Sequence, residues 1–238
     1  ASLLAPEAIG GTVNLISKEA TEDSTMLDTS FGSKDLRTLQ LHHSGVSADD
    51  ATGWTFTGQH DSRQQYDEDR NGVSETPFLR NNSLTARLSH DLSAQTNTVV
   101  RLSTVSSEVF GGPVLGDVTP SIRAALDGYD AEPSTGLFVA DNVNQRYQGK
   151  AWETSEWVKT ERTEAYNKWL HELSTDWSLE GAVSYARHQQ DSFYEGIDYA
   201  ADNDMWYGRL QLDQQTTAQV RLTLGLDRRV ETMRSATE

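Results

Sequence analysis

Apolar and polar residues alternate with a period of two along most of this chain. The clearest case is residues 220–227, where one face carries only aliphatic side chains and the other carries Arg221, Thr223 and Asp227. The aliphatic positions are Val220, Leu222, Leu224 and Leu226. The segments 84–92, 179–186 and 207–213 repeat the alternation. This period is the signature of a β-strand with one apolar face, so the sequence predicts an all-β fold.

The alternation predicts nine strands after residue 20. They are expected near 24–31, 36–46, 53–65, 81–92, 98–109, 161–173, 178–194, 205–215 and 219–232. Several exceed the ~9–11 residues that cross a bilayer, so they would project beyond it.

The predicted connections fall into two kinds. Short polar turns are expected at 48–51, 93–97, 174–176 and 216–218, and long connections at 66–80, 111–160 and 196–204, with one tight turn at 32–35. Short turns at one end and long loops at the other are typical of outer-membrane β-barrels.

A soluble β-sandwich also shows alternating strands. Two features favour an antiparallel transmembrane β-barrel instead. The polar faces repeatedly carry charged residues, and one expected loop, at 111–160, is unusually long for a compact domain.

Tryptophans are expected near strand ends, at Trp54, Trp169, Trp177 and Trp206. This placement fits an aromatic girdle at a membrane interface, and it fits equally the ordinary abundance of tryptophan in strands.

One motif near the start of the chain is more specific. Residues Ala8 to Lys18 read Ala-Ile-Gly-Gly-Thr-Val-Asn-Leu-Ile-Ser-Lys. The Gly10-Gly11 pair allows a tight bend before a short strand. The whole string resembles the segment that closes the plug domain of TonB-dependent outer-membrane receptors, just before their first barrel strand. A Tyr-Gly pair is usual a few residues earlier in that family, and Leu4-Ala5 stands in its place here.

The resemblance implies a domain organisation. Residues 1–20 would be the C-terminal end of a plug domain, and residues 21–238 the N-terminal part of a transmembrane β-barrel with a long extracellular loop at 111–160. The family's barrel has about 22 strands around its plug. Nine strands would leave two open edges, so we expect the sequence to be part of a longer chain or one piece of a cleaved chain, with completion by a partner polypeptide as the alternative.

The resemblance also implies a function. A receptor of this kind imports a scarce solute, such as a metal chelate, a siderophore or cobalamin, across the bacterial outer membrane. Its partners would be outer-membrane lipid, the TonB complex through the N-terminal part of the receptor, and a small-molecule ligand. Two alternatives stay open: a passive porin or barrel scaffold that sheathes another protein, and a soluble β-sandwich that acts as a binding module. None of the three is an enzyme, and no catalytic motif stands out.

Composition narrows these choices. The formal net charge of -16 argues against a nucleic-acid-binding surface. The absence of cysteine excludes disulfides and thiolate metal sites. Only 36% of residues are hydrophobic, which suits a barrel with a polar lumen better than a soluble core. No apolar run approaches the ~18 residues of a membrane-spanning helix, and no signal peptide is recognisable.

The acidic segment at 67–75 is a candidate calcium loop. Asp67, Asp69, Asn71 and Glu75 take relative positions 1, 3, 5 and 9, and Gly72 takes position 6. Phe78 replaces the bidentate glutamate of an EF-hand, so a solvated acidic loop remains the alternative.

Other candidates are weaker. A second acidic loop is expected around Asp198, Asp202 and Asp204. Adjacent His42 and His43 would point to opposite faces of a strand and so cannot chelate together. Aromatic residues of the long loop, such as Trp152 and Trp157, would either contact ligand or pack against their neighbours.

Overall fold

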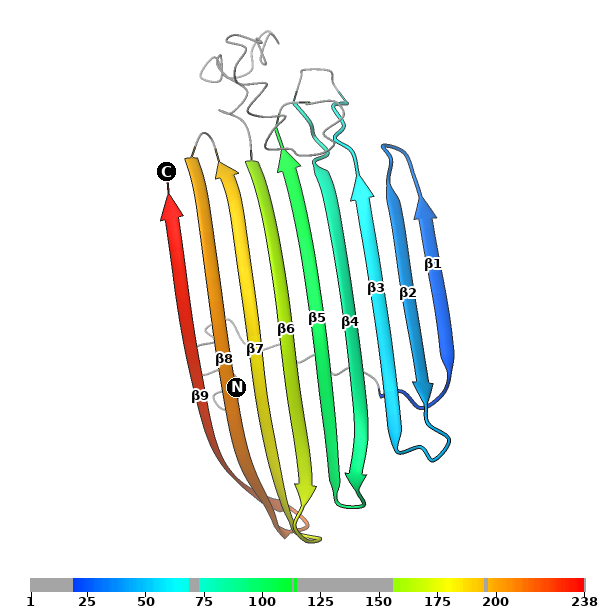
Figure 1. Cartoon of the computed structure of the whole chain (residues 1–238), viewed down its shortest axis with the longest axis vertical. Helices are drawn as coiled ribbons and strands as arrows, with labels where there is room; N and C mark the ends of the chain where they lie inside the picture. The colour runs from blue at the N-terminus through cyan, green and yellow to red at the C-terminus, as the bar shows by residue number, and fades with distance from the viewer. Residues whose placement is uncertain (1–18, 69–72, 113, 115–155, 195–196, 238) are drawn as a thin grey trace.

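The computed structural model describes residues 19–68, 73–112, 114, 156–194 and 197–237, which form one antiparallel sheet of nine strands (Figure 1). The strands are β1 (Ser24–Phe31), β2 (Arg37–Val46), β3 (Thr52–Arg63), β4 (Phe78–Ser93), β5 (Thr96–Gly111), β6 (Glu156–Glu172), β7 (Trp177–Tyr194), β8 (Ile197–Thr217) and β9 (Val220–Thr237). Each strand pairs with the next in the chain, so the sheet is a simple meander. The prediction of nine antiparallel strands is confirmed.

The connections lie at two ends of the sheet, as Figure 1 shows. The lower end is here called the turn end. Connections of at most five residues lie there, and they join β2 to β3, β4 to β5, β6 to β7 and β8 to β9. The opposite end, the loop end, carries the connections β3–β4 and β5–β6. The tight turn of residues 32–36 also lies there, closed by a hydrogen bond from the Gly32 N–H to the Leu36 carbonyl at 2.9 Å.

The three predicted long connections are wrong in extent. The expected loop at 66–80 ends earlier, because β4 begins at Phe78. The expected loop at 196–204 is the first part of β8, so Asp198, Asp202 and Asp204 belong to a strand and form no acidic loop. Strand β6 begins at Glu156, so Trp157 belongs to it instead of to the long connection. At the start of β8 the strand continues past the apolar segment with aspartates on one face, and at the start of β6 Trp157 packs in a buried row with Phe110 and Phe193.

The register assigns every strand residue to one of two faces, because paired residues in neighbouring strands point the same way. Leu222, Leu224 and Leu226 of β9 define one of them, the belt face. The opposite face of β9 carries Arg221 and Thr223 and is here called the polar face.

The apolar region of the belt face crosses the strands obliquely. Starting from Leu226, the row of register partners runs through Leu210, Gly181, Trp169, Thr98, His90 and Thr52. It therefore begins within the aliphatic part of β9 and ends on the first residue of β3, at the turn end. On β1 and β2 the aliphatic positions lie nearer the loop end, at Leu27, Leu39 and Leu41. Such an offset is expected where strands tilt by about 35–45° from a membrane normal.

No helix in the described segments is long and apolar enough to cross a membrane. A row of buried aromatic side chains lies at the loop end on the belt face. Phe78, Phe110, Trp157 and Phe193 are cross-strand neighbours in one row, and each is at most 9% exposed.

Candidate functional site

The belt face carries a band of exposed apolar side chains, here called the belt, to which every strand but β6 contributes; Ala165 and Asn167 lie at the corresponding positions of β6. Its members are Leu27, Leu39, Leu41, Trp54, Phe56, Leu84, Leu88, Leu102, Val183, Trp206, Leu210, Leu222, Leu224, Leu226 and Val230. Exposure reaches 68% at Leu224 and 75% at Leu226. Water-soluble monomers rarely expose an apolar patch that extends over a whole sheet. A second sheet that could cover the belt, as in a β-sandwich, is absent from the described residues.

Polar side chains within the belt form hydrogen bonds with other residues of the sheet. The Asn167 amide donates to the Thr98 hydroxyl at 3.0 Å and to the Val99 carbonyl at 3.2 Å. The Tyr185 hydroxyl, whose ring lies 4.6 Å from that of Trp206, donates to the Asp204 carboxylate at 2.6 Å. Such internal pairing is what a hydrocarbon environment requires of buried polar groups.

Two tryptophans near the turn end cover glycines on the neighbouring strand. Trp54 lies over Gly45, and Trp169 lies over Gly181. A Cβ atom added to either glycine would approach the indole ring within 2.4 Å and 2.2 Å, respectively. Both indoles thus lie flat on the sheet at the edge of the belt, where an amphipathic ring is stabilised at a lipid–water interface. Trp206 was expected near a strand end, but it lies within β8.

The segment that precedes β1 packs against the polar face of the sheet. Glu19 forms an ion pair with Arg87 of β4 at 3.6 Å, and the Ala20 carbonyl lies over Gly53 of β3, 3.2 Å from where a Cβ atom would be. Further along, the Ser44 hydroxyl donates to the Glu22 carbonyl, and the Val46 N–H donates to Asp23. Residues 19–23 therefore cross the polar face of β2, β3 and β4 before β1 begins. They are here called the entry segment.

A hollow of about 810 Å³ lies beside the entry segment on the polar face. Its charged lining residues are Glu19, Arg87, Arg101, Arg162, Glu164 and Lys168. Arg87 and Arg101 are direct register partners, so two like charges lie side by side on adjacent strands. Lys168 is held by Glu180 at 2.6 Å, and Arg162 by Glu164 at 2.5 Å. Three of the four basic groups are thus paired with Glu19, Glu164 and Glu180, and Arg101 adds a positive charge beside Arg87.

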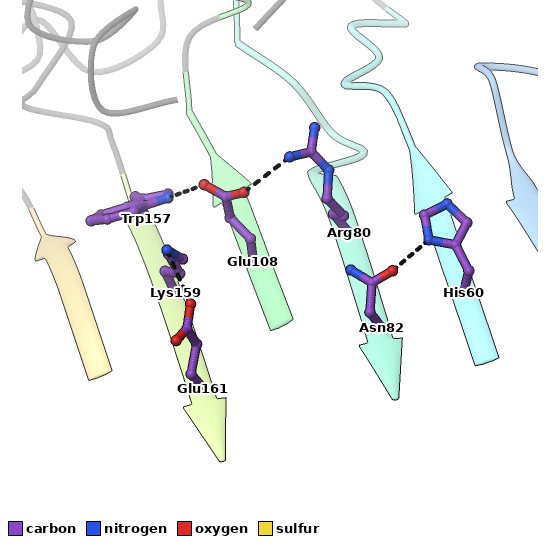
Figure 2. Close-up of polar contacts among 7 residues, drawn as sticks. All are labelled: His60, Arg80, Asn82, Glu108, Trp157, Lys159 and Glu161. Carbon is purple, nitrogen blue, oxygen red and sulfur yellow. Dashed lines mark hydrogen bonds and ion pairs between the residues drawn. The ribbon is translucent and has the colours of Figure 1, made fainter. Parts of the chain in front are cut away.

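Beyond the belt, towards the loop end, the belt face becomes hydrophilic (Figure 2). The Glu108 carboxylate accepts the indole N–H of Trp157 at 3.0 Å and pairs with Arg80 at 3.7 Å. His60 contacts the Asn82 side-chain oxygen at 2.7 Å. Charged side chains therefore lie beyond the belt on this face.

The candidate calcium loop lies only partly within the described residues. Asp69, Asn71 and Gly72 lie outside them, whereas Asp67 and Glu75 lie within. A Glu75 carboxylate oxygen accepts the backbone N–H of Glu68 at 2.7 Å, and Tyr66 and Thr76 form an isolated bridge across the connection. The described residues contain no cluster of three or more potential metal ligands. The calcium site stays a prediction.

The aromatic residues Tyr129, Phe138, Tyr147 and Trp152 of the expected long loop also lie outside the described residues.

The sequence reasoning missed a repeated contact on the belt face. Three histidines each contact a threonine on the adjacent strand: His43 with Thr25, His90 with Thr52, and His171 with Thr96. His42 and His43 do occupy opposite faces, as predicted. No local motif reveals the threonine partners, which lie 18 to 75 residues from their histidines.

Known structures similar to this chain include receptors for ferric catecholates and siderophores. The Escherichia coli K12 ferric-catecholate import receptor Fiu, in its closed form, has a TM-score of 0.65 at 17% identity and covers 95% of this chain. The siderophore receptor PiuA of Acinetobacter baumannii has a TM-score of 0.68 at 14% identity and covers 99%. The open form of Fiu has a TM-score of 0.60 at 15% identity and covers 91%.

This chain spans about a third of each receptor, 34% of the closed form of Fiu and of PiuA and 35% of the open form of Fiu. No protein-family model and no curated protein matches its sequence. At these identities the similarity establishes the fold. The resemblance to TonB-dependent outer-membrane receptors that residues 8–18 indicate is thus confirmed at the level of the fold, and the chain has the all-β architecture of part of a receptor barrel.

Proposed function

We propose that this chain forms part of the barrel wall of a TonB-dependent receptor that imports a scarce solute across the bacterial outer membrane. One observation carries the proposal: a single sheet exposes an oblique belt on one face and a charged surface on the other. Such a sheet matches a barrel wall between lipid and an aqueous lumen. Residues 1–20 would be the end of the plug.

The entry segment favours a plugged barrel over a passive porin. A chain that emerges from a plug must leave from inside the barrel and reach the first strand along the lumen wall. Residues 19–23 follow such a path, since Glu19 contacts Arg87 and Ala20 covers Gly53 on the polar face. A barrel without a plug has no need for such a path.

The class of solute follows from similarity and charge together. Fiu and PiuA are described as receptors for ferric catecholates and siderophores. Iron chelates of this kind are commonly anionic, and the register partners Arg87 and Arg101 offer adjacent positive charges on the polar face. A ferric siderophore is therefore the first solute to test, ahead of cobalamin. We propose no covalent chemistry on the solute.

An uptake assay tests the proposal. Cells that make the complete protein are supplied with radioactive iron bound to catecholate or hydroxamate siderophores, and in parallel with labelled cobalamin. We expect accumulation of one solute above that of vector-only cells, and its loss in a strain that lacks TonB. Uptake that is unchanged without TonB would favour a passive porin. A protein that stays monodisperse without detergent would instead indicate a soluble module.

Calcium would order the connection between β3 and β4 in this account. Weak extracellular sites have dissociation constants of about 10⁻⁴–10⁻³ M. One such site in 1 mM Ca²⁺ would stabilise the folded state by about 0.4–1.4 kcal/mol. We expect Ca²⁺, but not Mg²⁺, to slow proteolysis within residues 66–76, and the D67N/E75Q variant to lose this effect. Equal cleavage with and without Ca²⁺ would identify a solvated acidic loop.

A further inference from the structure

Three Thr–His contacts recur at one edge of the belt. Thr25 and His43 join β1 to β2, with the Oγ1 and Nδ1 atoms 2.9 Å apart. Thr52 and His90 join β3 to β4 at 2.8 Å, and Thr96 and His171 join β5 to β6 at 2.8 Å. In each pair the two residues are direct register partners on the belt face. Together they are here called the Thr–His line.

The line follows the oblique boundary of the belt. On β2, β4 and β6, each histidine lies two residues beyond an apolar belt-face residue in the direction of the turn end. These apolar residues are Leu41, Leu88 and Trp169. The histidines lie in different register rows, so they follow the tilt of the belt instead of one row of the sheet.

Each contact directs the chemistry of the imidazole ring. In a neutral ring whose Nδ1 accepts the threonine O–H, the proton resides on Nε2. In a charged ring, Nδ1–H donates to the threonine oxygen and Nε2 again carries a proton. In both of these states the ring presents an N–H donor on the side opposite the threonine, whereas a neutral ring with its proton on Nδ1 would present an acceptor there. A threonine O–H that donates to Nδ1 therefore leaves each histidine with a donor for a group outside the sheet.

The boundary of a bilayer supplies acceptors at this place. Below the acyl chains lie the ester and phosphate oxygens of phospholipids, and Trp54 and Trp169 lie at the same edge, as interfacial aromatic residues do. On β2 to β7, the described belt-face positions at this edge carry no Lys, Arg, Asp or Glu. The histidines are therefore the ionisable side chains of the strands there, and one acidic group, Asp49 of the β2–β3 turn, interacts electrostatically with His90 and accepts hydrogen bonds from Ser47 and the Ala51 N–H.

We propose that the Thr–His line binds the phosphate groups of phospholipids in the leaflet at the turn end of the sheet. His43, His90 and His171 each donate Nε2–H to a lipid phosphate, and the threonines hold the rings in the donating state. The inference rests on the proposed placement of the belt in a membrane. It adds a specific headgroup contact on alternate strands to the non-specific apolar contact of the belt.

Solid-state NMR of the complete protein in phosphatidylethanolamine–phosphatidylglycerol bilayers tests the contact directly. Dipolar dephasing of histidine Nε2 by lipid phosphorus reports their proximity, and single His→Phe variants assign each signal. We expect dephasing at His43, His90 and His171. His42, on the polar face, and His60, at the loop end next to Asn82, are matched controls in which we expect none from this leaflet.

Native mass spectrometry supplies the second measurement. Each hydrogen bond should contribute about threefold in affinity. Because three such bonds are lost, the H43F/H90F/H171F variant should bind phosphatidylethanolamine at least about tenfold more weakly than the H42F/H60F variant. Thr52→Val should weaken binding while keeping His90. Equal affinity in the two histidine variants would overturn the proposal.

The same bilayer samples separate this inference from the proposed function. Contacts between the methyl groups of Leu27 or Leu102 and lipid acyl chains report whether the belt lies in the membrane. Acyl contacts without histidine–phosphorus dephasing would overturn the Thr–His line alone. The absence of acyl contacts would overturn both the line and the membrane placement.

Discussion

Glu19 and Arg87 form a 3.6 Å ion pair that fastens the entry segment to the polar face of β4. The two partners differ in environment, because the Arg87 side chain is 13% exposed whereas that of Glu19 is 70% exposed. Arg87 also lies beside Arg101, a like charge that its pairing with Glu19 partly offsets. This contact links the chain before β1 to the wall of the sheet.

The energy of this pair should be small. An ion pair with one solvated partner contributes about 0.2–1 kcal/mol. A double-mutant cycle of Glu19→Gln and Arg87→Gln, followed by the free energy of unfolding in detergent micelles, should give a coupling in that range that shrinks at high salt. A coupling above about 3 kcal/mol would show that the pair is buried in the complete protein.

An arginine should distinguish the two faces of β5. Leu102 lies in the belt, whereas Val105 lies on the polar face, and both are exposed, at 55% and 37%. An arginine near the middle of a bilayer costs about 2–4 kcal/mol, so Leu102→Arg should lower the free energy of unfolding in lipid vesicles by that amount. Val105→Arg should change it by less than about 1 kcal/mol, because it faces water. Equal effects at both positions would contradict the assignment of the faces.

The Trp–Gly contacts should be sensitive to a single methyl group. Gly45→Ala and Gly181→Ala place a Cβ atom against an indole ring, whereas nothing lies within 4 Å of a Cβ atom at Gly208. We expect the first two variants to displace Trp54 and Trp169, shift the tryptophan emission and cost about 1–3 kcal/mol. Gly208→Ala is the control and should alter neither property. Unchanged emission in all three would mean that the indoles do not lie on the glycines.

The turn between β2 and β3 should loosen in acid. A hydrogen bond from the Ser47 hydroxyl, together with one from the Ala51 N–H, lowers the pKa of Asp49 below its ordinary value of 3.8. Because the folded pKa is depressed, the stabilisation is fully present above that value and is lost as the pH falls through the folded pKa. Hydrogen exchange at the Ala51 N–H, corrected for its intrinsic pH dependence, should lose protection in that range. Asp49→Asn should show weak protection at every pH.

The strands could be predicted from the sequence where lipid imposes a pattern. On β9, every second residue from Val220 to Leu226 is apolar, and the strand is found where the alternation placed it. Beyond the belt, at the start of β8, the alternation is lost, and Asp198, Asp202 and Asp204 lie on the belt face. The start of β8 was therefore missed: Asp202 accepts a hydrogen bond from Gln189, and Asp204 accepts one from Tyr185. Their acidic sequence resembles a loop although they form a strand.

Contacts across strands could not be predicted because they depend on register. Thr96 and His171 are 75 residues apart in the chain, and the sequence of the intervening connection does not determine the register of β5 against β6. A register change of one residue would move His171 to the opposite face. The Trp–Gly pairs and the contact of Glu19 with Arg87 were inaccessible for the same reason. The fold class thus follows from local periodicity, and the details of both faces follow from pairing.

Spin labelling along β9 tests the central claim, which is that the belt faces lipid. The described chain contains no cysteine, so single cysteines can be introduced one at a time from Val220 to Asp227 in the complete protein, reconstituted in bilayers. We predict that collisions with oxygen are frequent at the even-numbered positions and rare at the odd-numbered ones, and that collisions with a water-soluble nickel complex show the opposite pattern. Equal access of the nickel complex to both sets would contradict the claim and show that this sheet does not form the wall of a membrane barrel.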